Sequence, residues 1–200
     1  GLLLNTAGVL GNDEFVIGLC RDLLAQPVDQ VDPEMVAAAT SVVAAHGGAE
    51  DFERLQNGFL TASTPQEQLR QLYALAEFDN ADLIARTCDF ALTSEVKTQN
   101  APFLLNRCIA NRKHGEQAWN FVRQNWQHAN DAFPGNTIIR MASSTSTLNS
   151  DAMEADVQSF FSEHPIAQAS KTLDQVLERQ RVNTDLRRRE SGIVADALKA

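Results

Sequence analysis

The stretch TPQEQLRQLYALAEFDNADLIARTCDFAL, residues 64–92, carries the signals that decide the fold. Thr64 precedes Pro65 and is followed three residues later by Glu67, which is the arrangement of a helix capping box with proline just inside it. Apolar residues then recur at spacings of three and four, a pattern that predicts a helix. Asn80 begins a second helix of the same kind a few residues later. Two short helices joined so closely indicate an antiparallel helical hairpin.

The same helix signals continue on both sides of this stretch, and strand signals are nearly absent. Asp32 before Pro33 is a helix start, and the pair Gly47-Gly48 is a helix stop. The predicted elements are helices over 35–46, 52–60, 64–76, 80–92, 103–110, 115–132 and 151–163, a short helix or strand over 136–141, a polar solvated loop over Ser143–Ser150, and two helices from Ala167 onward separated at Asn183-Thr184.

These elements predict an all-α fold of about ten helices. The segments share no fixed period, so a strict repeat of one motif is not indicated. We expect an irregular stack of antiparallel helix pairs, an armadillo- or HEAT-like superhelix, forming one domain over residues 1–200. The alternative is a compact bundle, which would need central helices that are apolar all round, and no segment has that pattern.

Charge and hydropathy narrow the range of partners. The 200 residues carry a formal net charge of −9. Residues 1–90 hold 14 acids and 4 bases, whereas residues 91–200 hold 12 acids and 13 bases. This distribution opposes a nucleic-acid partner, because binding to phosphate backbones needs clustered cations, and the single basic run at Arg187–Arg189 is interpreted as a solvated helix face. No apolar run is long enough to span a bilayer, so no membrane partner is expected.

The chain shows no catalytic or metal-binding motif. Its four histidines, at positions 46, 114, 128 and 164, include no pair one helical turn apart, and His46 is expected to interact with the last carbonyls of its own helix. Three cysteines, at 20, 88 and 108, form no C-x-x-C motif and are interpreted as core residues. The residues by themselves therefore indicate a non-catalytic, acidic interaction or scaffold domain without a cofactor.

One segment resembles a known family. Residues 116–126, EQAWNFVRQNW, resemble the "AW-x-F-V-x-x-N-W" signature of the C-terminal helical domain of zinc aminopeptidases of the aminopeptidase N and puromycin-sensitive type. Three further segments resemble family motifs in the right order: 95–100, where Asn100 stands in place of a common acid; 154–161, EADVQSFF; and 177–179 with Asn183. Leu186 lies near the position where the family often has a tryptophan.

The resemblance implies a C-terminal domain that closes over the active-site chamber of a zinc metallopeptidase. In that family an H-E-x-x-H segment with a downstream Glu binds the zinc and a G-x-M-x-N segment binds the peptide amino terminus. Both belong to an upstream catalytic domain, and neither occurs here. Because position 1 is Gly rather than Met, we expect the sequence to be part of a longer chain whose partners are that catalytic domain and a peptide substrate.

Trp119, Val122 and Trp126 share one face of the helix that carries this signature and are expected in the core. The candidates for peptide binding are Arg107, Arg112, Lys113 and Arg123, because a guanidinium can donate two hydrogen bonds to a peptide carboxylate. The alternative function is a free-standing helical-repeat scaffold that binds a protein or peptide. A cytoplasmic location is expected, because the cysteines are not expected to pair and the chain has no glycosylation sequon.

Overall fold

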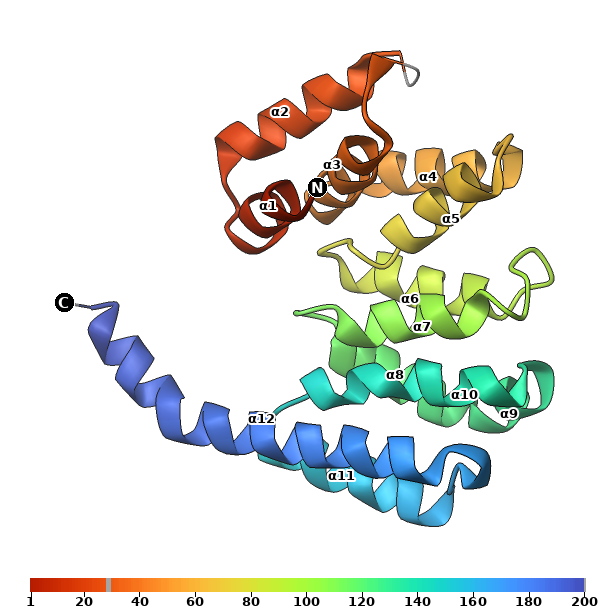
Figure 1. Ribbon diagram of the computed structural model, residues 1–200, viewed down its shortest axis with the longest axis vertical. Coiled ribbons are helices and arrows are strands. Elements are labelled where there is room, and N and C mark those ends of the chain that lie inside the picture. Colours follow the sequence, from red (N-terminus) through yellow and green to blue (C-terminus); the bar gives the residue numbers. More distant parts are fainter. Residues whose placement is uncertain (28–29, 200) are drawn as a thin grey trace. The chain divides into compact units, whose positions relative to one another are not determined.

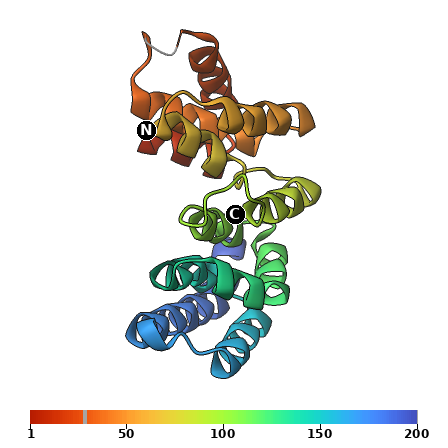
Figure 2. The ribbon, with the colours of Figure 1, turned by 90° about the vertical axis from the view of Figure 1, so that its right-hand side faces the viewer.

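A computed structural model describes residues 1–27 and 30–199 of the chain (Figures 1 and 2). Over these residues it contains twelve α-helices and no strand, so the predicted all-α class is confirmed and the expected count of about ten is slightly low. The chain divides into two compact units, residues 1–87 and 88–200, and the division falls inside α6. A single domain over 1–200 stays a prediction.

The first unit is built around α3. Its elements are α1 (Leu2–Asn5), a π-helical turn η1 (Thr6–Leu10), α2 (Glu14–Ala25), α3 (Pro33–Ala45), α4 (Ala49–Thr61), α5 (Pro65–Ala74) and the first part of α6 (Ala81–Ala91). α3 contacts α1, α2 and α5, and α4 packs beside α5. The apolar side chains of α2 and α3 form one core cluster of Ile17, Cys20, Ala39, Val42 and Val43.

Helix starts in this unit follow the predicted caps. The Asp32 carboxylate accepts hydrogen bonds from the backbone N–H groups of Glu34 and Met35, at 2.9 and 3.2 Å. The Thr64 hydroxyl accepts one from the Glu67 N–H at 3.2 Å. Each bond satisfies a donor that the first helical turn leaves without a partner. The capping residues therefore set where α3 and α5 begin.

The His46 ring bonds η1 rather than the last carbonyls of its own helix, so that expectation is wrong. Its Nε2 lies 2.7 Å from the carbonyl oxygen of Gly8, and the ring thereby joins the end of α3 to the π-helical turn. Gly8 also packs closely on α3, because a Cβ at this position would lie 2.6 Å from Cγ1 of Val42. Both contacts link segments more than thirty residues apart in sequence, which local pattern cannot reveal.

The second unit contains the remaining helices. They are α7 (Ala101–Ala110), α8 (Gly115–Gln124), α9 (Trp126–Ala132), α10 (Gly135–Ala142), a 3₁₀ segment η3 (Ser143–Thr147), α11 (Asp151–Glu163), a 3₁₀ turn η4 (Ala167–Ala169) and α12 (Ser170–Ala197). α7 packs on α8 and α10, and α11 packs beside α12 (Figure 1). The short segment 136–141 is helical rather than extended, so its strand alternative is wrong.

The predicted course of the chain is wrong at two asparagines. The helix expected over 115–132 breaks at Asn125, whose side-chain amide donates to the carbonyl of Phe121 at 2.9 Å and whose backbone leaves helical geometry. The break expected at Asn183-Thr184 is absent, and α12 continues through it. There Asn183 donates to the Ser146 carbonyl of η3 at 2.8 Å, and the Thr184 hydroxyl bonds the carbonyl one turn earlier. Asn183 therefore has a tertiary partner within a continuous helix, whereas Asn125, at the break, bonds the preceding turn of its own helix.

Candidate functional site

The predicted basic residues lie at two places in the second unit. Arg107 is in the last turn of α7, and Arg112 and Lys113 are in the turn that joins α7 to α8. All three side chains are exposed. Arg123 lies eight residues beyond Gly115, which is about 12 Å further along the axis of α8. The first three therefore lie close together in the chain, and Arg123 is separate from them.

Arg123 is held by two partners at the interface with α11. Its guanidinium donates to the carboxylate of Asp156 at 2.5 Å and to the side-chain oxygen of Asn120 at 2.7 Å. The other carboxylate oxygen of Asp156 accepts from the indole N–H of Trp119 at 2.7 Å. The side chains of Arg123 and Asp156 are 34% and 24% exposed, so this ion pair is partly shielded from water. Asp156 of α11 therefore links the two helices by accepting hydrogen bonds from Trp119 and Arg123 of α8.

An aromatic cluster continues this interface. Trp119 and Trp126 contact Phe160 and Phe161 with ring centroids 5.2–5.8 Å apart, mostly edge to face. The ring of His164 stacks on Phe160 at 4.2 Å. Edge-to-face contacts at these separations are favourable for aromatic rings. The expected core placement of Trp119, Val122 and Trp126 is confirmed, since all three are buried.

Asp156 is a joining residue that sequence reasoning missed. It lies inside the segment 154–161, which the resemblance singles out for its phenylalanines. Nothing in the local pattern pairs position 156 with positions 119 and 123. The segments 116–126 and 154–161 are each recognised from their own residues. The fold packs one against the other, which neither segment shows by itself.

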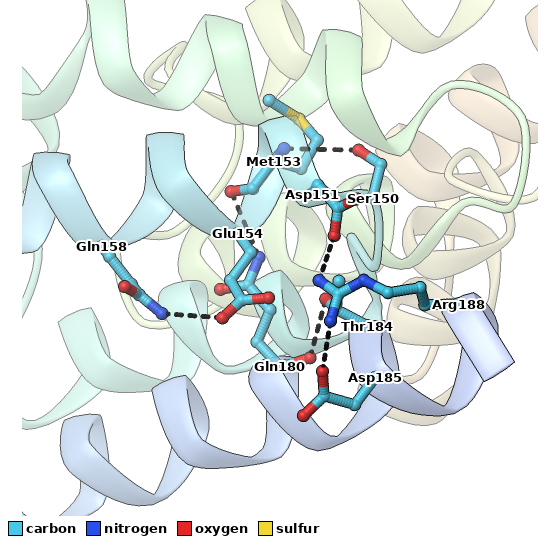
Figure 3. A network of polar contacts seen from close by, with 9 residues as sticks. All are labelled: Ser150, Asp151, Met153, Glu154, Gln158, Gln180, Thr184, Asp185 and Arg188. Carbon is cyan, nitrogen blue, oxygen red and sulfur yellow. Dashed lines mark hydrogen bonds and ion pairs between the residues drawn. The ribbon is translucent and has the colours of Figure 1, made fainter.

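A polar network links α11 to α12 (Figure 3). Gln180 is fully buried, and its amide N–H₂ group donates to the backbone carbonyls of Leu148 and Met153, at 2.8 and 3.3 Å. The Ser150 hydroxyl accepts from the N–H of Met153 and caps α11. A buried amide that satisfies two carbonyls fixes the position of one helix against the next segment.

The exposed side of the same network is ionic (Figure 3). Arg188 donates to Asp151 of α11 and, at 2.7 Å, to Asp185 of its own helix. The hydrogen bond to Asp151, aided by the charges of Asp151 and Asp185, raises the pKa of the Arg188 guanidinium. These side chains are open to solvent, so screening by water leaves such pairs a small contribution to stability.

The Ser/Thr segment 143–147 is not the solvated loop that its composition predicts. It forms the 3₁₀ helix η3 between α7 and α12, with Thr145 and Ser146 buried. Each of these two hydroxyls donates to a carbonyl three residues earlier, which satisfies it without water. Asn106 of α7 donates to the Ser143 hydroxyl, and Asn183 of α12 to the Ser146 carbonyl. Thr145 and Ser146 can be buried because their hydroxyls donate to carbonyls of the same stretch of chain.

The described residues offer neither a metal cluster nor a membrane-spanning helix. Over residues 1–27 and 30–199, no group of three or more His, Cys, Asp and Glu side chains is placed to hold a metal ion. Within the same ranges, none of the helices combines the length and apolar character needed to cross a membrane. The three cysteines all lie in the described part of the chain, where they are buried and form no disulfide, as expected for core residues.

Comparison with known proteins gives one family. The family described as the ERAP1-like C-terminal domain matches residues 1–182. Relatives include aminopeptidase M1-A of rice, 33% identical over 66% of this chain, and alanine/arginine aminopeptidase of baker's yeast, 24% identical over 82%. Aminopeptidase M1 of Arabidopsis thaliana is 25% identical over 92%. The chain spans only 15%, 19% and 22% of the lengths of these three relatives.

Proposed function

The chain belongs to the family of ERAP1-like C-terminal domains, and from this we propose that it is the non-catalytic closing domain of a zinc aminopeptidase. The match over residues 1–182 is the observation that carries the proposal. The relatives that align with this chain bear the names of aminopeptidases. We assign the zinc and the peptide-cleaving residues to an upstream catalytic domain of the same protein.

In this role the domain encloses the peptide and limits its length. A peptide held by its amino terminus at the catalytic centre extends its carboxylate away from that centre, toward the closing domain. Arg107, Arg112 and Lys113 are exposed cations at the joint between α7 and α8, and they are our candidates for binding that carboxylate. Arg123 can take part only by sharing or releasing Asp156.

The location proposed is the cytoplasm. Three thiols that form no disulfide are typical of a reducing compartment. The free-standing scaffold stays an alternative, and no specific contact in the described residues favours it.

A chimeric enzyme tests the proposed role. In aminopeptidase M1 of Arabidopsis thaliana, whose alignment covers 92% of this chain, the aligned segment would be replaced by the chain itself. We expect hydrolysis to depend on peptide length and to be faster for peptides with a free carboxylate than for the same peptides amidated. Replacing Arg107, Arg112 and Lys113 together by Gln should lower kcat/KM for free-acid peptides roughly tenfold, because charge-assisted hydrogen bonds are lost, and leave amidated peptides unchanged.

The control is a triple variant that removes three positive charges from α12 instead. Lys171, Arg179 and Arg181 are exposed on α12, and their joint replacement by Gln should leave the preference for free-acid peptides intact. Equal losses in the two triple variants, or no loss in either, would contradict the role of the α7–α8 joint. A chimera that cleaves short and long peptides alike would contradict the closing role itself.

A further inference from the structure

The second half of α12, taken as residues 185–197, has no buried side chain in the described part of the chain. The helix runs from Ser170 to Ala197, and its buried side chains are Leu173, Val176, Gln180 and Thr184. From residue 185 to 199 every side chain is exposed or half-exposed. In Figure 1 this half of α12 extends beyond α11. It also lies outside the part of the chain that matches the family.

Among the residues that the structure describes, polar contacts join the beginning of this half to other segments of the chain. Arg187 donates to the side-chain oxygen of Asn149 at 2.8 Å, and Arg188 donates to Asp151. Both contacts are exposed to solvent, so they contribute little to stability. The residues beyond them depend on helix propensity alone or on a partner.

Such a helix is marginal in water unless a partner covers it. Helical segments of about a dozen residues gain most of their stability from tertiary packing rather than from propensity. Gly192 lies inside this half and costs about 1 kcal/mol relative to alanine in a helix. A partner surface would offset this cost by burying apolar side chains.

Apolar side chains lie along one face of α12 on both sides of Arg189 and Glu190. Val182, Leu186, Ile193 and Ala197 are spaced by four, seven and four residues, so they lie along one face of the helix. The first three are 57%, 49% and 65% exposed. This α12 stripe is a different face from the one that holds Thr184 and Gln180 in the core, because those two residues are buried.

The α12 stripe is complementary to the same stripe of a second helix that runs in the opposite direction. Its midpoint falls between Arg189 and Glu190, a basic and an acidic residue whose side chains are 3.8 Å apart and make only a weak pair within one chain. If two copies of α12 cross antiparallel at this midpoint, Leu186 of one meets Ile193 of the other, twice. Arg189 then faces Glu190 across the interface, again twice. We propose that α12 pairs with α12 of a second copy of this chain in this antiparallel, two-fold arrangement.

The charge pattern selects a second copy rather than an arbitrary apolar partner. A parallel crossing would place Arg189 beside Arg189, which is repulsive. The antiparallel crossing matches both apolar pairs and both charged pairs with a single symmetry axis. A single pair of helices forms a small interface, so the dimer is weak and dissociates on dilution.

Sedimentation equilibrium of the 200-residue chain tests this pairing. The average mass should rise from the monomer toward the dimer as concentration increases from micromolar to millimolar. Ile193→Glu should keep the chain monomeric over the same range, because it places charge in the apolar stripe. Val194→Glu is the matched control, since Val194 is also exposed but lies about 100° around the helix from Ile193. It should leave the association unchanged.

A charge exchange tests the orientation. Arg189→Glu puts four acids at the midpoint of the dimer and should weaken association roughly tenfold, from two lost ion pairs and new repulsion. Adding Glu190→Arg restores opposite charges across the axis and should restore the association of the unmodified chain. Circular dichroism would confirm that each variant keeps the helical content of the folded chain.

Three results would overturn the proposal. One is a mass that does not depend on concentration. Another is equal weakening by Ile193→Glu and Val194→Glu, which would place the contact elsewhere on α12. The last is failure of Glu190→Arg to rescue Arg189→Glu, which would exclude the two-fold crossing at this midpoint. None of these outcomes depends on peptidase activity, so the proposed closing role is tested separately.

Discussion

Asp156 is the residue of α11 that joins two side-chain donors of α8. It accepts from the Trp119 indole and from the Arg123 guanidinium with its two carboxylate oxygens. Asp156→Asn would turn one acceptor into a donor, so either the Trp119 indole N–H or one N–H of the Arg123 guanidinium would lose its acceptor in a half-buried place. We expect a loss of about 1–3 kcal/mol in the free energy of unfolding, measured by urea denaturation.

Arg188→Gln is the control for this prediction. It removes the pair with Asp151, whose side chain is 72% exposed, and should change the free energy of unfolding by less than about 0.5 kcal/mol. Similar effects of the two substitutions would mean that burial does not distinguish these ion pairs.

At the scale of the elements, the joint between α7 and α8 contains a glycine that packs closely on the backbone of α7. A Cβ on Gly115 would lie 2.2 Å from the carbonyl oxygen of Ile109, a backbone atom that cannot move away without shifting α7. Gly115→Ala should therefore lower the free energy of unfolding by about 1–3 kcal/mol in urea denaturation.

A second glycine in the same unit gives the comparison. A Cβ added to Gly192 of α12 would meet no atom of another described element within 4 Å, so Gly192→Ala adds helix propensity without a clash. It should stabilise the chain by roughly 0.5–1 kcal/mol. Destabilisation by both alanines would contradict the assignment of Gly115 to a close approach.

At the scale of the whole molecule, the reactivity of a buried thiol shows whether the unit that contains it is folded. Cys20 lies in the core of the first unit, and Cys108 in the second. Burial raises the pKa of the Cys20 thiol, so less thiolate is present at neutral pH and alkylation is slowed until the pH rises further. We expect no alkylation of the folded chain and modification of both cysteines, with Cys88, in denaturant, measured by mass spectrometry.

Destabilising one unit should expose its own thiol first. Gly115→Ala should allow Cys108 to react at a lower urea concentration while Cys20 stays protected. Gly8→Ala, which would press on Val42 in the first unit, should expose Cys20 first. If both substitutions expose both thiols together, the two compact units unfold as one.

The family assignment can be reached from sequence because its motifs are local. The tryptophan segment, which runs from α8 to the first residue of α9, and the phenylalanine segment on α11 are each recognisable alone, in the order in which they follow along the chain. The site residues are different, since nothing in the structure tests which cations meet a peptide. Arg107, Arg112, Lys113 and Arg123 stay predictions, and Arg123 already has a partner in Asp156.

The sequence by itself determined the all-α class and most helix starts, because caps, prolines and apolar spacing act within a few residues of each other. Only the tertiary structure decided that α12 continues through Asn183, and that Thr145 and Ser146 of η3 are buried rather than part of a solvated loop. Their polar groups have partners within the fold: Asn183 bonds the Ser146 carbonyl from more than thirty positions away. A polar residue is exposed or buried according to where its hydrogen bonds are made, and contacts far apart in sequence settle that.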